Sequence, residues 1–183
     1  LSLQSLMWSA RLPSLLPWFG RMKAIVRLAH APFDPSEELR AFNAETEDVG
    51  AIVSFVGLAR GNAKDGSPIN ALVLERYRSV TLRSMEAIAD AAHARFEIGY
   101  SWVIHRDGRI LPGEPIVFVA TASAHRRAAF EAADYLIDRL KSEAVFWKWE
   151  EGPAGARWIE PTIRDAADLS RWADEHRTDH ARN

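Results

Sequence analysis

Two lysines that lie close together are the first residues whose type could do chemistry. Only four of the 23 basic residues are lysine, and two of these, Lys141 and Lys148, lie in the stretch DRLKSEAVFWKWEEG. Unlike arginine, a lysine that loses solvent can release its proton and then transfer protons or attack a carbonyl carbon. Lys148, between Trp147 and Trp149, is the better candidate for such desolvation. In the alternative, Lys148 reaches solvent from a strand and Lys141 completes a helix C-terminus.

A second group of candidates stands at the start of a predicted helix, in the stretch SAHRRAAF. The free N–H groups and the dipole of a helix N-terminus favour an anion. His125 and Arg126 add donors that suit a phosphate or a carboxylate. In the alternative, Arg126 and Arg127 only pair with Glu131 or with solvent.

A third basic group lies in the loop LARGNAKDGSP, which contains Arg60 and Lys64. Such a glycine-containing loop can fold over an anionic substrate, although it more often forms only a solvated hairpin tip. His93 and His105 have no partner at the spacing of metal ligands. We therefore expect both histidines to be structural, and we expect no metal site.

Composition limits the classes of function. The chain has 183 residues, of which 48% are hydrophobic and 26% charged, enough for one domain with a core. Its net charge of −2 gives no overall attraction to nucleic acid or an anionic membrane, so we expect neither as a partner. The chain has no cysteine, which rules out disulfides, thiolate metal sites and cysteine nucleophiles and fits a reducing cytoplasm.

Residues 1–21 differ from the rest. They are rich in Leu, Ser, Trp and Pro, and their apolar runs are too short to cross a bilayer. Arg11 and two prolines interrupt the stretch, unlike the pattern of a signal peptide. We expect an extension outside the fold, with a docking arm as the alternative. A single domain is expected over residues 22–175, and a polar tail over 176–183.

The predicted elements mix strands and helices without regular βαβ alternation, which favours the α+β class. Asp34, Pro35 and Glu37 are typical of a helix start, and Ser123 is expected to cap the long helix that reaches Lys141. The turn residues between residues 49–60 and 69–77 predict a hairpin with a long tip. Strands are expected at residues 23–29, 49–60, 69–77, 100–106, 116–122, 145–150 and 157–161, and helices from 34, at 81–96, at 124–141 and at 165–176.

One distance follows from helix geometry. His125 and Lys141 lie 16 positions apart on one predicted helix, which separates them by roughly 24 Å at about 1.5 Å per residue. They cannot line one small-molecule pocket within a single chain. Either the chain has two sites, or a second copy completes one site, as a symmetric dimer would do twice.

The order of the motifs carries a family resemblance. The stretches GAIVSFVGLAR, ALVLERY, VIHRDGRILPGEPIVFVATASAHRRAAFEAADYLIDRLKSEAVFWKWE and RWIE together resemble the catalytic large subunits of molybdopterin synthase, from about Met22 to Trp172. The most specific parts are SAHR..AF, the LK followed by FWK, and the GEPIVFV strand.

The resemblance implies an α/β-hammerhead fold with an additional antiparallel β lobe. It implies a homodimer within a heterotetramer, in which each end carries a small ubiquitin-like sulfur-carrier subunit. The carrier's C-terminal Gly-Gly, as a thiocarboxylate, would enter a pocket where cyclic pyranopterin monophosphate (precursor Z) receives two sulfurs and becomes molybdopterin. The implied activity is a cytoplasmic sulfurtransferase step of molybdenum cofactor biosynthesis that uses no metal or organic cofactor.

The resemblance also implies site residues. The catalytic residues would be Lys141, where the carrier tail ends, and Lys148, which faces the pterin. The substrate-binding residues would be Arg60, Arg157 and the neighbouring subunit's equivalents of His125 and Arg126. Trp149 departs from the family, which usually has a basic residue there, so either the pocket is less positive or this side chain faces elsewhere. The loop RGNAKDG also departs, which leaves its substrate contacts open.

Two other classes of function stay open. A non-catalytic module would use the same residues to bind a Gly-Gly tail or an anionic metabolite. A Schiff-base enzyme would use one lysine as a nucleophile. Because both lysines and all the basic pocket residues are present, the sequence favours the sulfurtransferase.

Overall fold

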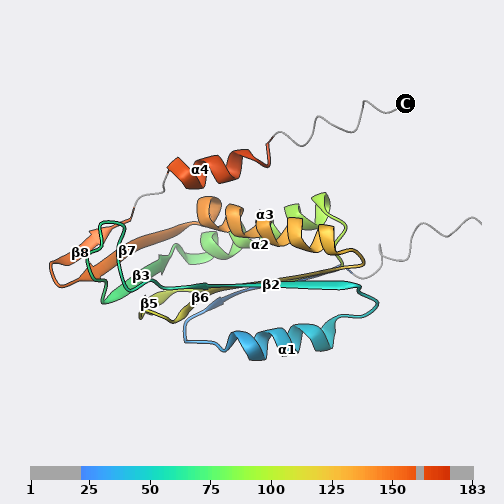
Figure 1. Cartoon of the computed structure of the whole chain (residues 1–183), viewed down its shortest axis with the longest axis horizontal. Helices are drawn as coiled ribbons and strands as arrows, with labels where there is room; N and C mark the ends of the chain where they lie inside the picture. The colour runs from blue at the N-terminus through green and yellow to red at the C-terminus, as the bar shows by residue number, and fades with distance from the viewer. Residues whose placement is uncertain (1–21, 160–162, 174–183) are drawn as a thin grey trace, which may run out of the picture.

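The computed structural model describes residues 22–159 and 163–173 (Figure 1). Within these ranges the chain forms two four-stranded sheets and four helices, which confirms the predicted α+β class. In chain order the elements are β1 (Lys23–Ala29), α1 (Pro35–Glu45), β2 (Ala51–Leu58), β3 (Ala71–Arg76), α2 (Arg78–Arg95), β4 (Tyr100–Arg106), β5 (Gly108–Ile110), β6 (Pro115–Ser123), α3 (Arg126–Glu143), β7 (Phe146–Gly152), β8 (Gly155–Trp158) and α4 (Ile163–Ser170).

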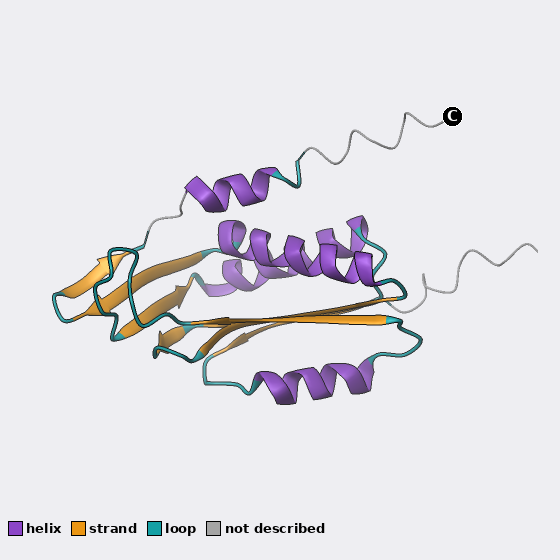
Figure 2. Cartoon of the chain, viewed as in Figure 1, coloured by secondary structure: helices purple, strands orange, loops and turns teal. Residues whose placement is uncertain are grey.

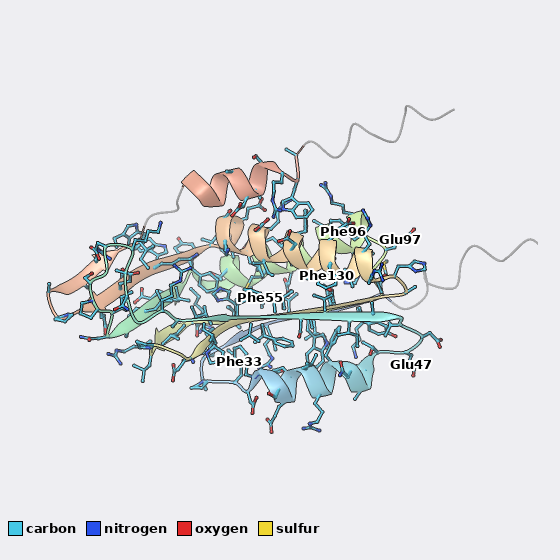
Figure 3. The ribbon with its side chains drawn as sticks, viewed as in Figure 1. Phe33, Glu47, Phe55, Phe96, Glu97 and Phe130 are labelled. Atoms are coloured by element: carbon cyan, nitrogen blue, oxygen red, sulfur yellow. The ribbon has the colours of Figure 1, made fainter. Side chains whose placement is uncertain are left out.

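The first sheet has the order β1-β4-β6-β2 and is covered on both faces (Figure 2). β1 and β4 are parallel, whereas β4–β6 and β6–β2 are antiparallel. Helix α1 covers one face, and α2 and α3 cover the other, so Phe33 and Phe55 lie on opposite sides of the sheet (Figure 3). Both faces of β4 and β6 are therefore buried, which explains their nearly continuous apolar sequences.

The second sheet has the order β5-β3-β7-β8, and all its strands are antiparallel. It is the additional antiparallel lobe that the resemblance implied. Its small core consists of Ala59, Leu74 and Ile110, and Phe146 packs against this core as well as against the larger core under α2 and α3. The end of α3 and the start of β7 thus lie where the two sheets meet.

The predicted hairpin of β2 and β3 is wrong. β2 pairs with β6 in the first sheet, and β3 pairs with β5 and β7 in the second. The loop does turn back, because Asn62 and Pro68 form an isolated antiparallel bridge. Ala59, however, exchanges backbone hydrogen bonds with the turn at Gly113 and Glu114, so the two strands diverge. Turn residues report a local reversal, whereas the choice of strand partner depends on burial against distant residues.

Several predicted boundaries also differ. Ser123 does not cap α3, because it still belongs to β6. Its hydroxyl donates to the Glu97 carbonyl at 2.6 Å and accepts from the His125 N–H at 3.2 Å, and His125 is the N-cap residue instead. The predicted N-cap Asp34 is confirmed, since its carboxylate accepts from the Ser36 N–H at 2.8 Å. The three-residue strand β5 was missed.

The ends of the chain are described only in part. The predicted last helix ends earlier than expected, at Ser170, and residues 171–173 form a turn. The predicted extension at 1–21, the tail at 176–183 and the expected helix residues 174–176 lie outside the described residues. Within the described residues, every helix is too short or too polar to cross a membrane.

Candidate active site

A cavity of about 580 Å³ opens where the two sheets meet beside the C-terminal end of α3. This volume is typical of small-molecule sites, which span about 300–1,000 Å³. Its walls are mostly apolar side chains of β2, β3, β6 and α3. Four basic side chains also line it: Arg60, His105, Lys141 and Lys148. The structure therefore brings together three of the predicted site residues and adds a histidine.

The passage from helix α3 to strand β7 brings both lysines to this cavity. Lys141 lies in the last turn of α3, where a positive charge is favourable because it faces the negative end of the helix dipole. The helix ends at Ala144, which has extended backbone angles, and β7 begins two residues later. Lys148 is then the third residue of β7 and pairs with Leu74 of β3, itself a cavity residue. Lys141 is exposed at the cavity mouth, and Lys148 is half-buried.

The neighbouring tryptophans do not bury Lys148, contrary to the expectation from the sequence. Side chains alternate along a strand, so Trp147 and Trp149 point to the face opposite Lys148. There they pack on Trp158, with ring centroids 5.6 Å and 6.3 Å away. Of the two explanations for Trp149, the structure thus supports the second: this side chain faces elsewhere. The apolar cavity walls, rather than the tryptophans, shield Lys148.

Arg60 reaches the cavity because of an irregularity near the end of β2. The register with β6 shifts between Gly57 and Leu58, and such a bulge re-aims the strand that follows. Gly57 is itself required for the wall: a Cβ atom there would lie 2.6 Å from a methyl of Val117. Among the described residues, neither Arg60 nor Lys141 forms an ion pair, so both charges are available to a ligand.

His105 contributes to the cavity although the sequence suggested a structural role. It is 7% exposed, and its Nδ1 donates to the Arg106 carbonyl at 2.8 Å. Its ring stacks on Phe146, with centroids 4.3 Å apart. Burial, with a smaller contribution from the nearby charge of Lys148, lowers the pKa of His105 to about 4. The available signal was its place in YSWVIHR, on the same strand face as Val103. His93, in contrast, makes a structural contact with the Ser101 hydroxyl at 2.9 Å.

His125 and Arg126 do not reach this cavity within one chain. Both are exposed at the N-terminal end of α3, while Lys141 lies in its last turn. Because α3 is one unbroken helix, the rise per residue separates His125 from Lys141 by about 24 Å. Arg127 pairs with Glu131 at 3.8 Å, as one alternative expected. His125 and Arg126 make no ion pair in the described part of the chain.

Arg157 lies on β8, away from the cavity, and is already paired. Its guanidinium contacts Glu150 and Asp65, each at 2.7 Å, beside a smaller hollow of about 150 Å³. These hydrogen bonds, first that of Glu150 and then that of Asp65, raise the pKa of Arg157. Two hydrogen bonds from Ser67 and one from Arg157 keep the pKa of Asp65 well below its usual range.

The chemistry that the cavity offers is anion binding and proton transfer. Within the described residues, no group of three His, Asp or Glu side chains could hold a metal ion. Three cations around an apolar space would attract an anionic ligand, and they would stabilise negative charge that develops in a reaction. Fold and cavity together thus define an α+β protein with a small-molecule site built for anions.

Comparisons with known proteins identify the family. Residues 28–143 match the family model described as MoaE protein, so the chain belongs to this family. The molybdopterin synthase catalytic subunit of Caulobacter vibrioides is 52% identical over 151 residues, which cover 82% of this chain and 99% of that protein.

Solved structures agree with this assignment. The molybdopterin biosynthesis MoaE protein from Burkholderia ambifaria is 38% identical, with a TM-score of 0.69 over 82% of this chain and 99% of that one. The complex of subunits 1 and 2 of molybdopterin-converting factor from Helicobacter pylori has a TM-score of 0.63 over 74% of this chain and 90% of that one. At 20% identity this last likeness shows the fold alone.

Proposed function

We propose that the chain is the catalytic subunit of a molybdopterin synthase. It would transfer sulfur from the thiocarboxylated C-terminus of a small carrier subunit to cyclic pyranopterin monophosphate, in the cytoplasm. The observation that carries this proposal is the convergence of Arg60, Lys141 and Lys148 on one cavity. The family and the 52% identical catalytic subunit support the same activity.

Each residue type suits one part of the reaction. The thiocarboxylate sulfur adds to a carbon of the pterin precursor, and an oxygen leaves that carbon with a proton. The half-buried Lys148 would give this proton and would then stabilise the oxyanion that forms when water attacks the acyl carbon. Hydrolysis breaks the acyl–sulfur bond, so the sulfur stays on the pterin and the carrier leaves as a carboxylate.

Lys141 and Arg60 would act at the mouth of the cavity. Both are exposed and without an ion pair in the described part of the chain, so they can hold the anionic end of an incoming tail. The partner would be a small ubiquitin-like subunit whose Gly-Gly end is slender enough to enter between the two sheets. The 52% identical Caulobacter vibrioides relative is named a catalytic subunit, which supports a partner subunit for this chain.

We also propose that a second copy completes the site. β2 is an edge strand of the first sheet, and its exposed side chains include Ile52 and Val56. Its first residue, Ala51, pairs with Ser123 near the start of α3, whereas Leu58 at its other end lines the cavity. If two β2 edges pair antiparallel about a two-fold axis, the start of one strand lies beside the end of the other.

That arrangement would bring the second copy's His125 and Arg126 to the cavity mouth, where they would hold the cyclic phosphate. It accounts for two donors at the far end of α3 that are exposed and form no ion pair with any described residue. It also agrees with the 24 Å separation that helix geometry imposes. A substrate contact of Arg157 stays a prediction, and it would require the guanidinium to leave the two carboxylates that it contacts within the chain.

Reconstitution tests the proposed function. The chain is mixed with a thiocarboxylated carrier and precursor Z, and dithiolene formation is followed for the wild type, Lys141→Ala and Lys148→Ala. We expect turnover by the wild type and severe loss in both variants. Binding of the carrier or the pterin without any dithiolene from the wild type would instead support the non-catalytic module.

A further inference from the structure

The strongest unassigned feature is the histidine in the cavity wall. His105 is the sixth residue of β4, between Leu28 of β1 and Val117 of β6. It is buried among these strands, yet it lines the same cavity as Lys148, and its ring stacks on Phe146, two residues before that lysine. Phe146 and Lys148 are on the same face of β7, because side chains alternate.

The hydrogen bond of His105 determines which ring nitrogen can meet a ligand. A carbonyl oxygen only accepts, so the Nδ1 atom that lies 2.8 Å from the Arg106 carbonyl must carry the hydrogen. In the neutral ring, Nε2 then has the lone pair and is an acceptor. The stack on Phe146 prevents the ring from turning freely.

The surroundings keep this ring neutral. Burial is the main cause that lowers its pKa to about 4, and the charge of Lys148 adds to it. The hydrogen bond to Arg106 and the carboxylate of Asp107 act in the opposite direction but do not prevail. Asp107 is committed elsewhere, since it pairs with His30 and Arg76. The other charges on the cavity, those of Lys141 and Arg60, are also positive.

We propose that His105 is a positioning residue for Lys148: its Nε2 accepts a hydrogen bond from the Lys148 ammonium and aims this group at the reacting atoms. The proposal rests on the proposed function of the same site and deepens it. A neutral acceptor favours the protonated form of an amine, because it stabilises the ammonium group. Lys148 then acts as a proton donor and oxyanion partner, and not as the nucleophile of a Schiff base.

The structure offers a matched pair of variants. In His105→Asn the amide can replace Nδ1 as the donor to Arg106, but no acceptor remains near Nε2. In His105→Gln the amide can reach the position of Nε2. His105→Phe keeps the stack on Phe146 and loses both nitrogens, so it serves as a second loss variant if His105→Asn does not fold.

The first readout does not depend on activity. The full-length chain is labelled with trace acetic anhydride over a pH series, and acetylation is measured at each lysine by mass spectrometry. We expect the midpoint for Lys148 to fall by about one pH unit in His105→Asn and His105→Phe and to recover in His105→Gln. Lys141, on another element, is the internal reference and should not change. Equal Lys148 midpoints in the wild type and both loss variants would overturn the proposal.

The second readout is the pH–rate profile of dithiolene formation. In both loss variants we expect kcat to fall roughly tenfold and the alkaline decline of the rate to begin at lower pH. A merely structural role would not move that decline, so an unchanged profile would count against the proposal. A wild type without synthase activity would refute the proposed function, whereas the labelling would still decide the role of His105.

Discussion

Two regions of this chain carry predicted basic site residues but surround them differently. Around the cavity, Arg60 and Lys141 meet no acid in the described part of the chain, and Lys148 and His105 lie against apolar walls. On β8 of the second sheet, Arg157 lies between Asp65 and Glu150. We therefore infer that Arg60 and Lys141, which meet no acid in the described residues, are better candidates for ligand binding than Arg157.

The largest effect is expected from a matched pair of neutral substitutions. Lys148→Met keeps the unbranched shape of the side chain and removes the proton donor, so we expect the rate of dithiolene formation to fall at least about 100-fold. Arg157→Met should change it by less than about threefold, because Arg157 already uses its charge within the chain. Reconstitution assays with both variants measure this. Equal losses would mean that the paired cluster also touches the substrate.

The next prediction tests whether a second copy of the chain, bound through β2, completes the site. A lysine at position 52 would place a charge in the apolar contact between the two β2 edges, so Ile52→Lys should give a monomer and a roughly tenfold slower enzyme. Leu111→Lys is the matched control, because Leu111 is also exposed and apolar but lies in the turn before β6. Light scattering during size-exclusion chromatography gives the mass. A fully active monomer of Ile52→Lys would refute the composite site.

A smaller effect concerns stability and pH. The pKa of His105 is about 4 in the folded chain and near the usual 6.5 when unfolded. Between pH 6.5 and pH 4, His105 is therefore protonated in the unfolded chain but neutral in the folded one. Protonation thus favours the unfolded chain, and the free energy of unfolding decreases as the pH falls from 6.5 towards 4. His105→Phe should reduce this loss by about 2–3 kcal/mol. Urea unfolding at pH 7 and pH 4.5 measures it. The pKa of His93 is also lowered. Because His93 is present in the wild type and in His105→Phe, it does not contribute to the difference between them.

The smallest effect is expected at the ion pair of Asp65 and Arg157. Asp65→Asn removes one of the two acids that Arg157 contacts, yet both side chains are exposed. Exposed pairs contribute little, because solvent screens them. We therefore expect no measurable change in rate or in Tm by calorimetry. A lower rate would show that the position of Arg157 matters for the reaction.

What the sequence could predict was mostly local. The bounds of β1 and β4 and the Asp34 cap were correct, since alternation and capping depend on neighbouring residues. The partner of β2 was wrong, because pairing is decided by distant burial. β5 has three residues, too few for any periodic signal.

For the candidate site, too, the sequence predicted the residues of local motifs but not the contacts between distant segments. The motifs named Arg60, Lys141 and Lys148, and the structure places all three on one cavity. His105 was missed because alternation in YSWVIHR predicts only which strand face it shares with Val103, and not the cavity formed by distant residues. The role of Trp149 was left open because only the packing on Trp158 shows which way it faces.

Complementation between two inactive chains tests the composite cavity most directly. Lys141→Ala and Arg126→Ala are each purified, mixed under conditions of subunit exchange, and assayed with carrier and precursor Z. In a mixed dimer, one cavity would have both wild-type residues and the other neither. We expect recovery to about a quarter of the wild-type rate in a random mixture, because half of the dimers are mixed and each has one complete cavity. A rate that stays at the mean of the two separate variants would contradict it.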